Sequence, residues 1–366
     1  MKKSRHLVHV AFILALFLIV SIVRCSASSG NQDFKCTELA QIDTGGDTFD
    51  VQVEGDIAYV IDMGSSVPPP GGLVIIDVSD PSHPSQIGHL FDGGIAHEIF
   101  VDGNLAYVAD HGDGLEIINV SNPSQPVEID HFDEGYEEID GVYVVEDIAY
   151  VIVWLDELEI TELIIIDVSN PFMPLKLGEY NNESLGSRLQ VINDLAYVAG
   201  AQDGLKILNV SDPANIAELG RFSDGGFSFS VDVVGSYAYV ADGSGGLEII
   251  DVTDPVNPVK VGEYHDGGSV VDLHVIGELV YVADSQEGLE IIDVSDPSNP
   301  VELAHYDQEE HVRIFVADDI AYLATHGGGL KIIKIETTEN TKSSEFDLVF
   351  LFIAFFGLLV WRKRRV

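Results

Sequence analysis

Cysteine and basic residues are scarce in this chain, and each shortage excludes a class of protein. The only cysteines are Cys25 and Cys36, too few for a disulfide framework or a cysteine-based zinc site. Only 18 Lys and Arg residues stand against 61 Asp and Glu residues, so the net charge is -43. Such a field repels polyanions, which excludes nucleic acid as a partner. The sequence also lacks a Gly-x-Ser-x-Gly elbow and a His-Glu-x-x-His motif.

Many of the basic residues gather at the two ends of the chain, next to its two long apolar runs. Residues 7–23 follow Lys2, Lys3 and Arg5 and precede a stretch of small residues around Ala27. This order predicts that residues 1–28 are a signal peptide, cleaved after Ala27, with an uncleaved signal anchor as the alternative.

The second apolar run, residues 348–361, ends directly at a basic tail. As a helix it covers only about 21 Å, less than the roughly 30 Å of a bilayer core. Together with the polar linker at residues 336–346, it resembles the C-terminal sorting signals of prokaryotic surface proteins, archaeal ones especially. We therefore expect residues 347–366 to form an apolar anchor helix, as a transmembrane or sorting segment. The positive-inside rule then predicts a cell-surface protein, anchored to the cytoplasmic membrane by its C-terminus.

Between these ends the sequence repeats with a period of 42 residues. A strand-like segment with a tyrosine recurs at Tyr59, Tyr107, Tyr150, Tyr197, Tyr239, Tyr281 and Tyr322. A second apolar segment follows each one, as at residues 73–77 and 247–251. In six units an Asp-Pro or Asn-Pro turn comes next, and it ends the strand because proline removes an amide donor.

Each unit has room for four short antiparallel strands, and this period is typical of β-propeller blades. The seventh unit lacks its fourth strand. An unpaired strand, residues 37–43, precedes the first unit and matches residues 301–307 closely. We therefore predict an all-β fold, a seven-bladed β-propeller of four-stranded blades over residues 36–335, closed by this N-terminal strand.

The repeated Leu-x-Ile-Ile-Asp segment, with the Val-Ser and Asp-Pro that follow it, resembles the LVIVD-repeat family of prokaryotic surface proteins. The resemblance extends over nearly the whole region between the two ends. It implies a β-propeller of extracellular type and assigns no catalytic residues. The Gly-His and Trp-Asp signatures of WD repeats are missing.

One face of the predicted propeller carries two insertions. In an up-and-down blade, the loops between the second and third strands share a face with the connections between blades. The insertions lie in two such loops, at Pro68, Pro69 and Pro70 and at Asp156, Glu157 and Glu159. Since function is often placed on loops of a fixed scaffold, we expect these loops to contact a ligand, with simple loop drift as the alternative.

The same face is rich in carboxylates and histidines. Our metal-ligand candidates are Asp110, His97, His111 and Asp272, because carboxylates suit Ca²⁺ and histidines suit a transition metal. Acidic residues are frequent everywhere, so we expect no cofactor, with Ca²⁺ as the alternative. Asn182 begins an Asn-x-Ser sequon in a predicted loop and is a candidate for glycosylation.

These features favour a membrane-anchored surface module that presents an acidic face to an extracellular protein, a glycan or a divalent cation. The alternative is an extracellular hydrolase or lyase at the mouth of the propeller channel. Its candidate catalytic residues lie nine positions before a repeat tyrosine and would meet at one level of the channel: Glu98, Asp272, Arg188 and Arg313.

Overall fold

The computed structural model describes residues 32–64, 70–91, 94–135, 138–155, 160–182, 185–307, 311–325 and 327–339. In these ranges the chain forms 28 strands and one short 3-10 helix, η1 (Pro213–Asn215). The all-β prediction is therefore confirmed.

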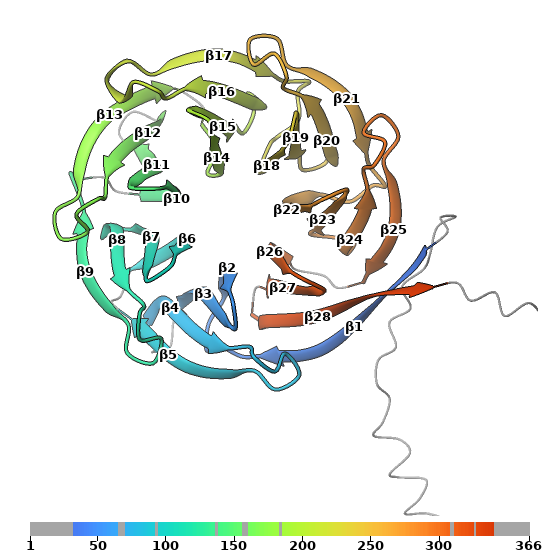
Figure 1. The fold of residues 1–366 in the computed structure, drawn as a ribbon, viewed down its shortest axis with the longest axis horizontal. Helices are drawn as coiled ribbons and strands as arrows, with labels where there is room; N and C mark the ends of the chain where they lie inside the picture. The colour runs from blue at the N-terminus through green and yellow to red at the C-terminus, as the bar shows by residue number, and fades with distance from the viewer. Residues whose placement is uncertain are drawn as a thin grey trace, which may run out of the picture.

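The strands form seven four-stranded antiparallel sheets, which surround a central channel as the blades of a propeller (Figure 1). In the first six blades, four consecutive strands lie in order from the channel outward. Blade 1 contains β2 (Thr48–Glu54), β3 (Ile57–Gly64), β4 (Pro70–Asp77) and β5 (Ser85–Phe91). Blade 2 contains β6 (Ile95–Asp102), β7 (Leu105–His111), β8 (Gly114–Asn119) and β9 (Val127–Phe132). Blade 3 contains β10 (Glu138–Val145), β11 (Ile148–Leu155), β12 (Ile160–Asp167) and β13 (Leu175–Asn182).

The next three blades repeat this arrangement. Blade 4 contains β14 (Leu189–Ile192), β15 (Leu195–Ala199), β16 (Leu205–Asn209) and β17 (Ala217–Phe222). Blade 5 contains β18 (Ser230–Val234), β19 (Tyr237–Ala241), β20 (Leu247–Asp251) and β21 (Val259–Tyr264). Blade 6 contains β22 (Val270–Ile276), β23 (Leu279–Asp284), β24 (Gly288–Asp293) and β25 (Val301–Tyr306).

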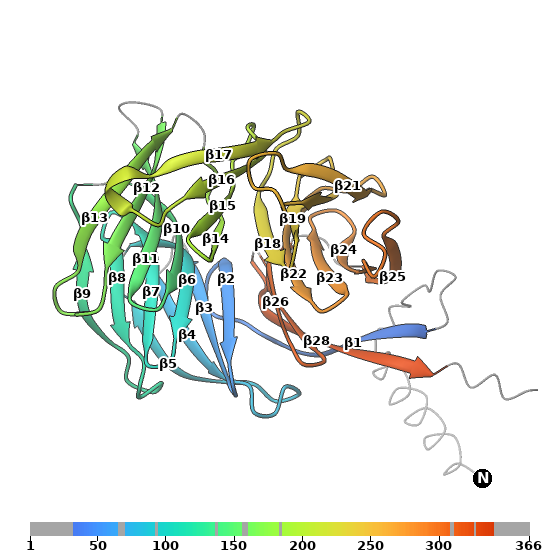
Figure 2. The same cartoon turned by 45° about the horizontal axis from the view of Figure 1, so that its top comes forward.

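The seventh blade combines the two ends of the described chain. Its strands β26 (His311–Ala317), β27 (Ile320–Thr325) and β28 (Gly329–Glu339) are completed by β1 (Gln32–Ile42), which pairs antiparallel with β28. Figures 1 and 2 show β1 alongside β28. The predicted closure by the N-terminal strand is confirmed. The pairing also extends beyond residues 36 and 335, because Lys35 lies opposite Glu336 and Gln32 opposite Glu339.

The hydrophobic core is divided among the spaces between neighbouring blades. Val60 and Val74 of blade 1, for example, pack in one cluster with Tyr322 and Ile332 of blade 7. The second and third strands of each blade are thus covered by apolar side chains on both sides. This explains why their sequences are mostly apolar instead of alternating, with single charged residues such as Glu248 and Lys206 in some third strands.

The proline turns follow one pattern and lie on the face opposite the connections between second and third strands, such as that between β7 and β8. In blade 5, the carbonyl oxygen of Asp254 accepts a hydrogen bond from the Asn257 amide at 3.0 Å, and its Oδ1 accepts one from the Val256 amide at 3.1 Å. The turns of blades 2, 4, 5 and 6 also pack closely on a glycine in the outer strand of the preceding blade. A side chain at Gly262 would overlap the Pro297 carbonyl, so this close approach requires glycine.

Several sequence predictions lie outside the described residues. They are the signal peptide at residues 1–28 and the apolar segment at residues 347–366. In the part of the chain that the structure describes, no helix is long and apolar enough to span a bilayer.

Candidate functional site

The first strands of the blades surround a cavity of about 300 Å³ at the centre of the ring. Three sets of residues, aligned by their distance from the repeat tyrosines, occupy successive levels of these strands. We call the residues ten positions before a tyrosine the mouth ring; its members with described side chains are Phe49, His97, Asp140, Ser187, Phe229 and Val271. The charged ring, nine positions before, consists of Asp50, Glu98, Gly141, Arg188, Ser230, Asp272 and Arg313. The lower ring, seven positions before, consists of Gln52, Phe100, Tyr143, Gln190, Asp232, His274 and Phe315.

A β-bulge separates the mouth ring from the rest of the strand. In blade 1 the pairing register shifts between Thr48 and Asp50, and the same shift occurs at the equivalent position of blades 2, 3, 6 and 7. A bulge breaks the simple alternation of side chains. Consecutive residues such as Phe49 and Asp50 therefore both lie near the channel.

Arg188 is the centre of the charged ring. Its Nη2 donates a hydrogen bond to Asp50 Oδ1 at 2.8 Å, and its Nε forms an ion pair with Glu98 Oε1 at 2.9 Å without hydrogen-bond geometry. These contacts join blade 4 to blades 1 and 2 across the channel. Burial raises the pKa of Glu98 to about 8, although Arg188 and Arg313 oppose the rise. Burial, reinforced by repulsion from Arg188, lowers the pKa of Arg313.

The carboxylates of the charged ring also connect neighbouring blades. Asp50 Oδ2 accepts a hydrogen bond from the Ile99 amide at 3.0 Å, and Glu98 Oε2 accepts one from the Val142 amide at 2.8 Å. Asp272 Oδ2 accepts one from the Ile314 amide at 3.0 Å. Each first strand has an edge without a neighbouring strand in its own sheet, so these amides would otherwise lack a partner. The charged ring therefore has a structural role.

The lower ring repeats this linkage one level deeper. Gln52 Oε1 accepts a hydrogen bond from the Val101 amide at 2.7 Å, and Asp232 Oδ2 accepts one from the Val275 amide at 2.8 Å. His274 Nδ1 accepts one from the Val316 amide at 2.9 Å, which defines the tautomer of that ring. Polar side chains in the channel thus accept the hydrogen bonds of edge amides that no neighbouring strand of the same sheet covers.

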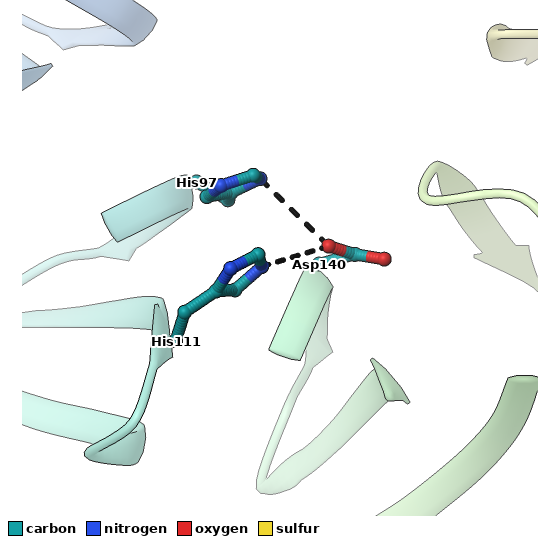
Figure 3. Close-up of side chains that lie close together, drawn as sticks. All are labelled: His97, His111 and Asp140. Carbon is teal, nitrogen blue, oxygen red and sulfur yellow. Dashed lines mark hydrogen bonds and ion pairs between the residues drawn. The ribbon is translucent and has the colours of Figure 1, made fainter. Parts of the chain in front are cut away.

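At the mouth ring, three blades contribute one cluster of side chains. His111, from the end of β7, contacts Asp140 Oδ1 through Nε2 at 2.9 Å, and the His97 ring stacks on His111 with 3.8 Å between centroids (Figure 3). Phe49 lies 4.8 Å from His97, and the Arg313 guanidinium lies 5.3 Å from the Phe49 ring.

The two histidines of this cluster differ in pKa. Burial, and then the charge of His111, lowers the pKa of His97 to about 4, so this ring is neutral at pH 7. For His111, burial alone would lower the pKa, but the hydrogen bond to Asp140 and the Asp140 charge outweigh it and raise the pKa. The cluster therefore pairs one neutral and one more basic imidazole.

The structure brings some of the predicted site residues together and separates others. Glu98, Arg188, Asp272 and Arg313 share the charged ring; their catalytic role stays a prediction. Among the described groups that could hold a metal ion, His97 and His111 come together with Asp140, whereas Asp110 and Asp272 do not join them.

Asp50 was not predicted as a site residue, although the repeat points to it, and Asp140 was noted only as one of many acidic residues on the face with the insertions. Asp50 lies nine residues before Tyr59, as Glu98 does before Tyr107. Asp140 lies ten residues before Tyr150, as His97 does before Tyr107.

The loop predictions have different outcomes. Pro68, Pro69, Asp156, Glu157 and Glu159 lie outside the described residues, and Pro70 begins β4. Asn182 is the last residue of β13, opposite Thr161, and does not lie in a loop as predicted. The strand continues because β12 also reaches back to Ile160.

Comparison with solved structures supports the propeller fold, whereas comparison with curated sequences does not identify a relative. No curated protein sequence matches the chain. Among solved structures, the computationally designed protein Ika8 is similar with a TM-score of 0.59 at 9% sequence identity, covering 81% of this chain and 99% of that chain. The WD40 domain of Neurospora crassa Pan2 is similar with a TM-score of 0.61 at 11% identity, covering 84% of this chain and 97% of that chain. At such identities these similarities show the fold alone.

A family model gives a more specific result. The LVIVD repeat matches residues 45–90, 93–134, 139–182, 186–224, 225–266 and 267–308, which correspond to blades 1 to 6. Blade 7 is divided between the two ends of the described chain, so its four strands are not one continuous stretch of sequence. With six matched repeats over more than half of its length, the chain belongs to the LVIVD repeat family.

Proposed function

We propose that this propeller is a binding module, anchored in a membrane and displayed on the cell surface, that holds a protein or glycan ligand at the mouth of its channel. The observation that carries the proposal is the use of the channel carboxylates. Asp50, Glu98 and Asp272 each accept a main-chain hydrogen bond from the next blade. These hydrogen bonds hold the first strands together, so they give rigid support to the rim of the channel, by which we mean the mouth ring and the connections next to it.

The rim itself has the composition of a recognition surface. Phe49 and His97 present aromatic rings in the cluster with Asp140. Next to blade 5, the ring centroids of Phe227 and Phe229 lie 4.8 Å apart at an interplanar angle of 45°, and Phe227 is 42% exposed. Aromatic faces next to a few oriented polar groups suit both sugar rings and peptide side chains. The network around Arg188 holds this rim in place.

The rim can be tested by removing one aromatic ring from each face. We expect Phe227→Ala to weaken ligand binding about tenfold or more, since a well-packed aromatic contact contributes on the order of 1–3 kcal/mol. The matched control is Phe172→Ala, because Phe172 is 70% exposed but lies in a proline turn on the opposite face. Purified protein would be screened on glycan arrays and against defined extracellular proteins, and each hit measured by calorimetry.

Equal loss in both variants, or none in either, would contradict binding at the mouth. A ligand that is cleaved, with turnover lost in Glu98→Gln, would instead favour the second candidate, an extracellular hydrolase or lyase. The observation behind that candidate is that Glu98 and Asp272 line one cavity with Arg188.

The membrane anchor is proposed from the sequence of residues 347–366. We expect the full chain to sediment with membranes and a chain ending at residue 346 to remain in the supernatant, because only the former keeps the apolar run and basic tail. Fractionation followed by protease treatment of intact cells would measure both anchoring and display. A full chain found in the soluble fraction would contradict the anchor.

A further inference from the structure

Blade 6 contains three carboxylates whose oxygens converge away from the channel. Asp266 lies in the connection before β22, Asp284 ends β23 and Glu290 lies in β24. One oxygen of each lies within 4.8 Å of the others. Asp284 is 0% exposed and Glu290 is 1% exposed, whereas Asp266 is open to solvent.

Three of the buried oxygens of this group, one on Asp284 and two on Glu290, have no hydrogen-bond donor. Asp284 Oδ1 accepts main-chain hydrogen bonds from Gln286 at 2.7 Å and Glu287 at 2.9 Å, but its Oδ2 has no partner. Both Oε atoms of Glu290 also lack one. A buried carboxylate without a donor or counter-charge is costly, so a proton or a cation must lie between these groups.

Neighbouring blades show how the same position is usually neutralised. Blade 5 has the equivalent carboxylates Asp224, Asp242 and Glu248, and Lys260 lies among them, with Nζ 2.9 Å from Asp224 Oδ2 and 3.0 Å from Glu248 Oε1. Lys260 therefore supplies the cation from within the chain.

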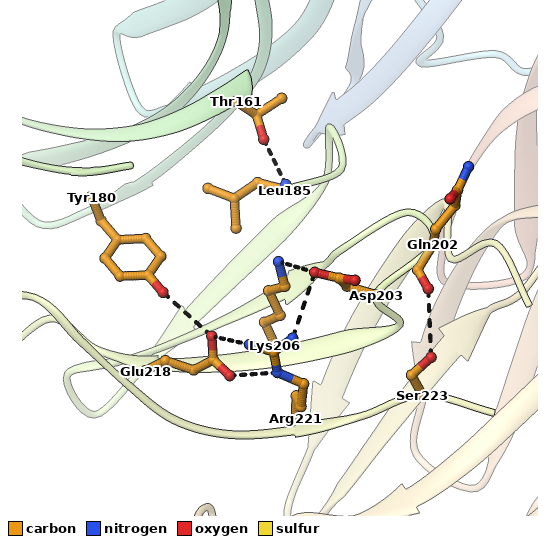
Figure 4. A network of polar contacts seen from close by, with 9 residues as sticks. All are labelled: Thr161, Tyr180, Leu185, Gln202, Asp203, Lys206, Glu218, Arg221 and Ser223. Carbon is orange, nitrogen blue, oxygen red and sulfur yellow. Dashed lines mark hydrogen bonds and ion pairs between the residues drawn. The ribbon is translucent and has the colours of Figure 1, made fainter. Parts of the chain in front are cut away.

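Blade 4 reaches the same result with a different residue. Lys206 occupies the position of Glu290, fully buried, and its Nζ lies 2.7 Å from Asp203 Oδ2 (Figure 4). Blade 7 also has a lysine there, Lys331, which lies 3.7 Å from Glu38.

Blade 6 has no lysine at either position. Glu302 stands where blade 5 has Lys260, as the shared register opposite Ile292 and Ile250 shows. His305, which lies opposite Glu290, contacts Glu302 through Nδ1 at 2.7 Å and Asp307 through Nε2 at 3.3 Å. The blade thus adds carboxylates where its neighbours add ammonium groups.

We propose that Asp266, Asp284 and Glu290 bind a Ca²⁺ ion. The ligand set consists of oxygen atoms alone, which suits a hard divalent cation and not a thiophilic or imidazole-binding metal. Solvent reaches the site past Asp266. The ion fastens the connection between blades 5 and 6 to the centre of blade 6, a role independent of any ligand at the channel mouth.

The test uses the full chain in detergent, treated with chelator and then titrated with CaCl₂. Ionic strength is kept constant with NaCl, because a chain of net charge -43 is stabilised by any salt that screens it. We expect Ca²⁺ to raise Tm by about 5 °C at saturation. Asp284→Asn and Glu290→Gln should abolish this shift, and the matched blade 5 variant Glu248→Gln should keep it.

A fourth variant keeps the three ligands and tests the charge argument. Glu302→Lys introduces an ammonium group where blade 5 has one, so it should no longer respond to Ca²⁺. Calorimetry should show that this variant binds one Ca²⁺ ion fewer than the wild type. A wild-type Tm that does not change with Ca²⁺, a response to Mg²⁺ alone, or a Ca²⁺ shift that survives Asp284→Asn and Glu290→Gln would overturn the proposal.

Discussion

Replacing Arg188 with methionine should destabilise the protein by about 3 kcal/mol, measured as the free energy of unfolding in denaturant. Arg188 neutralises Asp50 and Glu98, which are 4% and 6% exposed. Methionine fills a similar volume but removes the guanidinium that contacts both buried carboxyl groups. Removing one partner of a buried ion pair is costly for this reason, although each partner also keeps its main-chain amide.

The pH dependence of this variant identifies the cause. With Arg188 present, Glu98 has a pKa of about 8, above the usual value for the unfolded chain. A carboxyl group with a raised pKa favours the folded state at low pH, and that contribution is lost as the pH rises through the folded pKa. Without Arg188 the pKa of Glu98 rises further. The deficit of the variant should therefore be larger at pH 9 than at pH 7.

Two further variants separate charge from packing. Arg221 also pairs with a carboxylate, Glu218, at 2.6 Å, but its side chain is 49% exposed (Figure 4). Arg221→Met should cost less than about 1 kcal/mol, since exposed pairs are screened by water. Adding Asp50→Asn to Arg188→Met should recover part of the loss, because it removes one unpaired charge. Equal costs for the two arginine variants would mean that the charged ring is not a buried network.

The repeat sequence predicts the fold in detail because each blade obeys the same physical rules. The period located the tyrosine strands, and the absence of a fourth strand after residue 335 predicted the pairing of β1 with β28. The shared spacing also placed Glu98, Arg188, Asp272 and Arg313 at one level. These results depend only on strand alternation and on the need to cover strand edges.

Contacts across the channel could not be predicted in the same way. Arg188 pairs with Asp50 of blade 1, which is not its neighbour in the ring, because a long side chain reaches across the centre. The sequence also did not show that Asp266, Asp284 and Glu290 come together in blade 6. That this group lacks an internal cation becomes clear only from the strand register, which places Glu302 at the position that Lys260 occupies in blade 5.

Removing β1 should have the largest effect of any change considered. A chain that begins at Thr44 lacks Phe34 and Cys36, which are 6% and 4% exposed and belong to the core cluster between blades 6 and 7. It also loses the hydrogen bond from the Tyr306 hydroxyl to Glu38. Burial of these side chains, with Leu39 and Ile42, contributes about 6 kcal/mol, comparable with the total stability of many proteins.

We therefore expect the shortened chain to lose its cooperative thermal transition and to associate through the exposed edge of β28, as measured by calorimetry and size-exclusion chromatography. A chain that begins at Gln32 is the control, because it keeps every residue of β1. A peptide of residues 32–43 added to the shortened chain should restore the monomer by pairing with β28, whereas the same peptide with Phe34→Asp and Cys36→Asp should not. If the shortened chain melts like the control, the ring does not depend on closure by β1, and the seventh blade is held by its contacts with blades 1 and 6 alone.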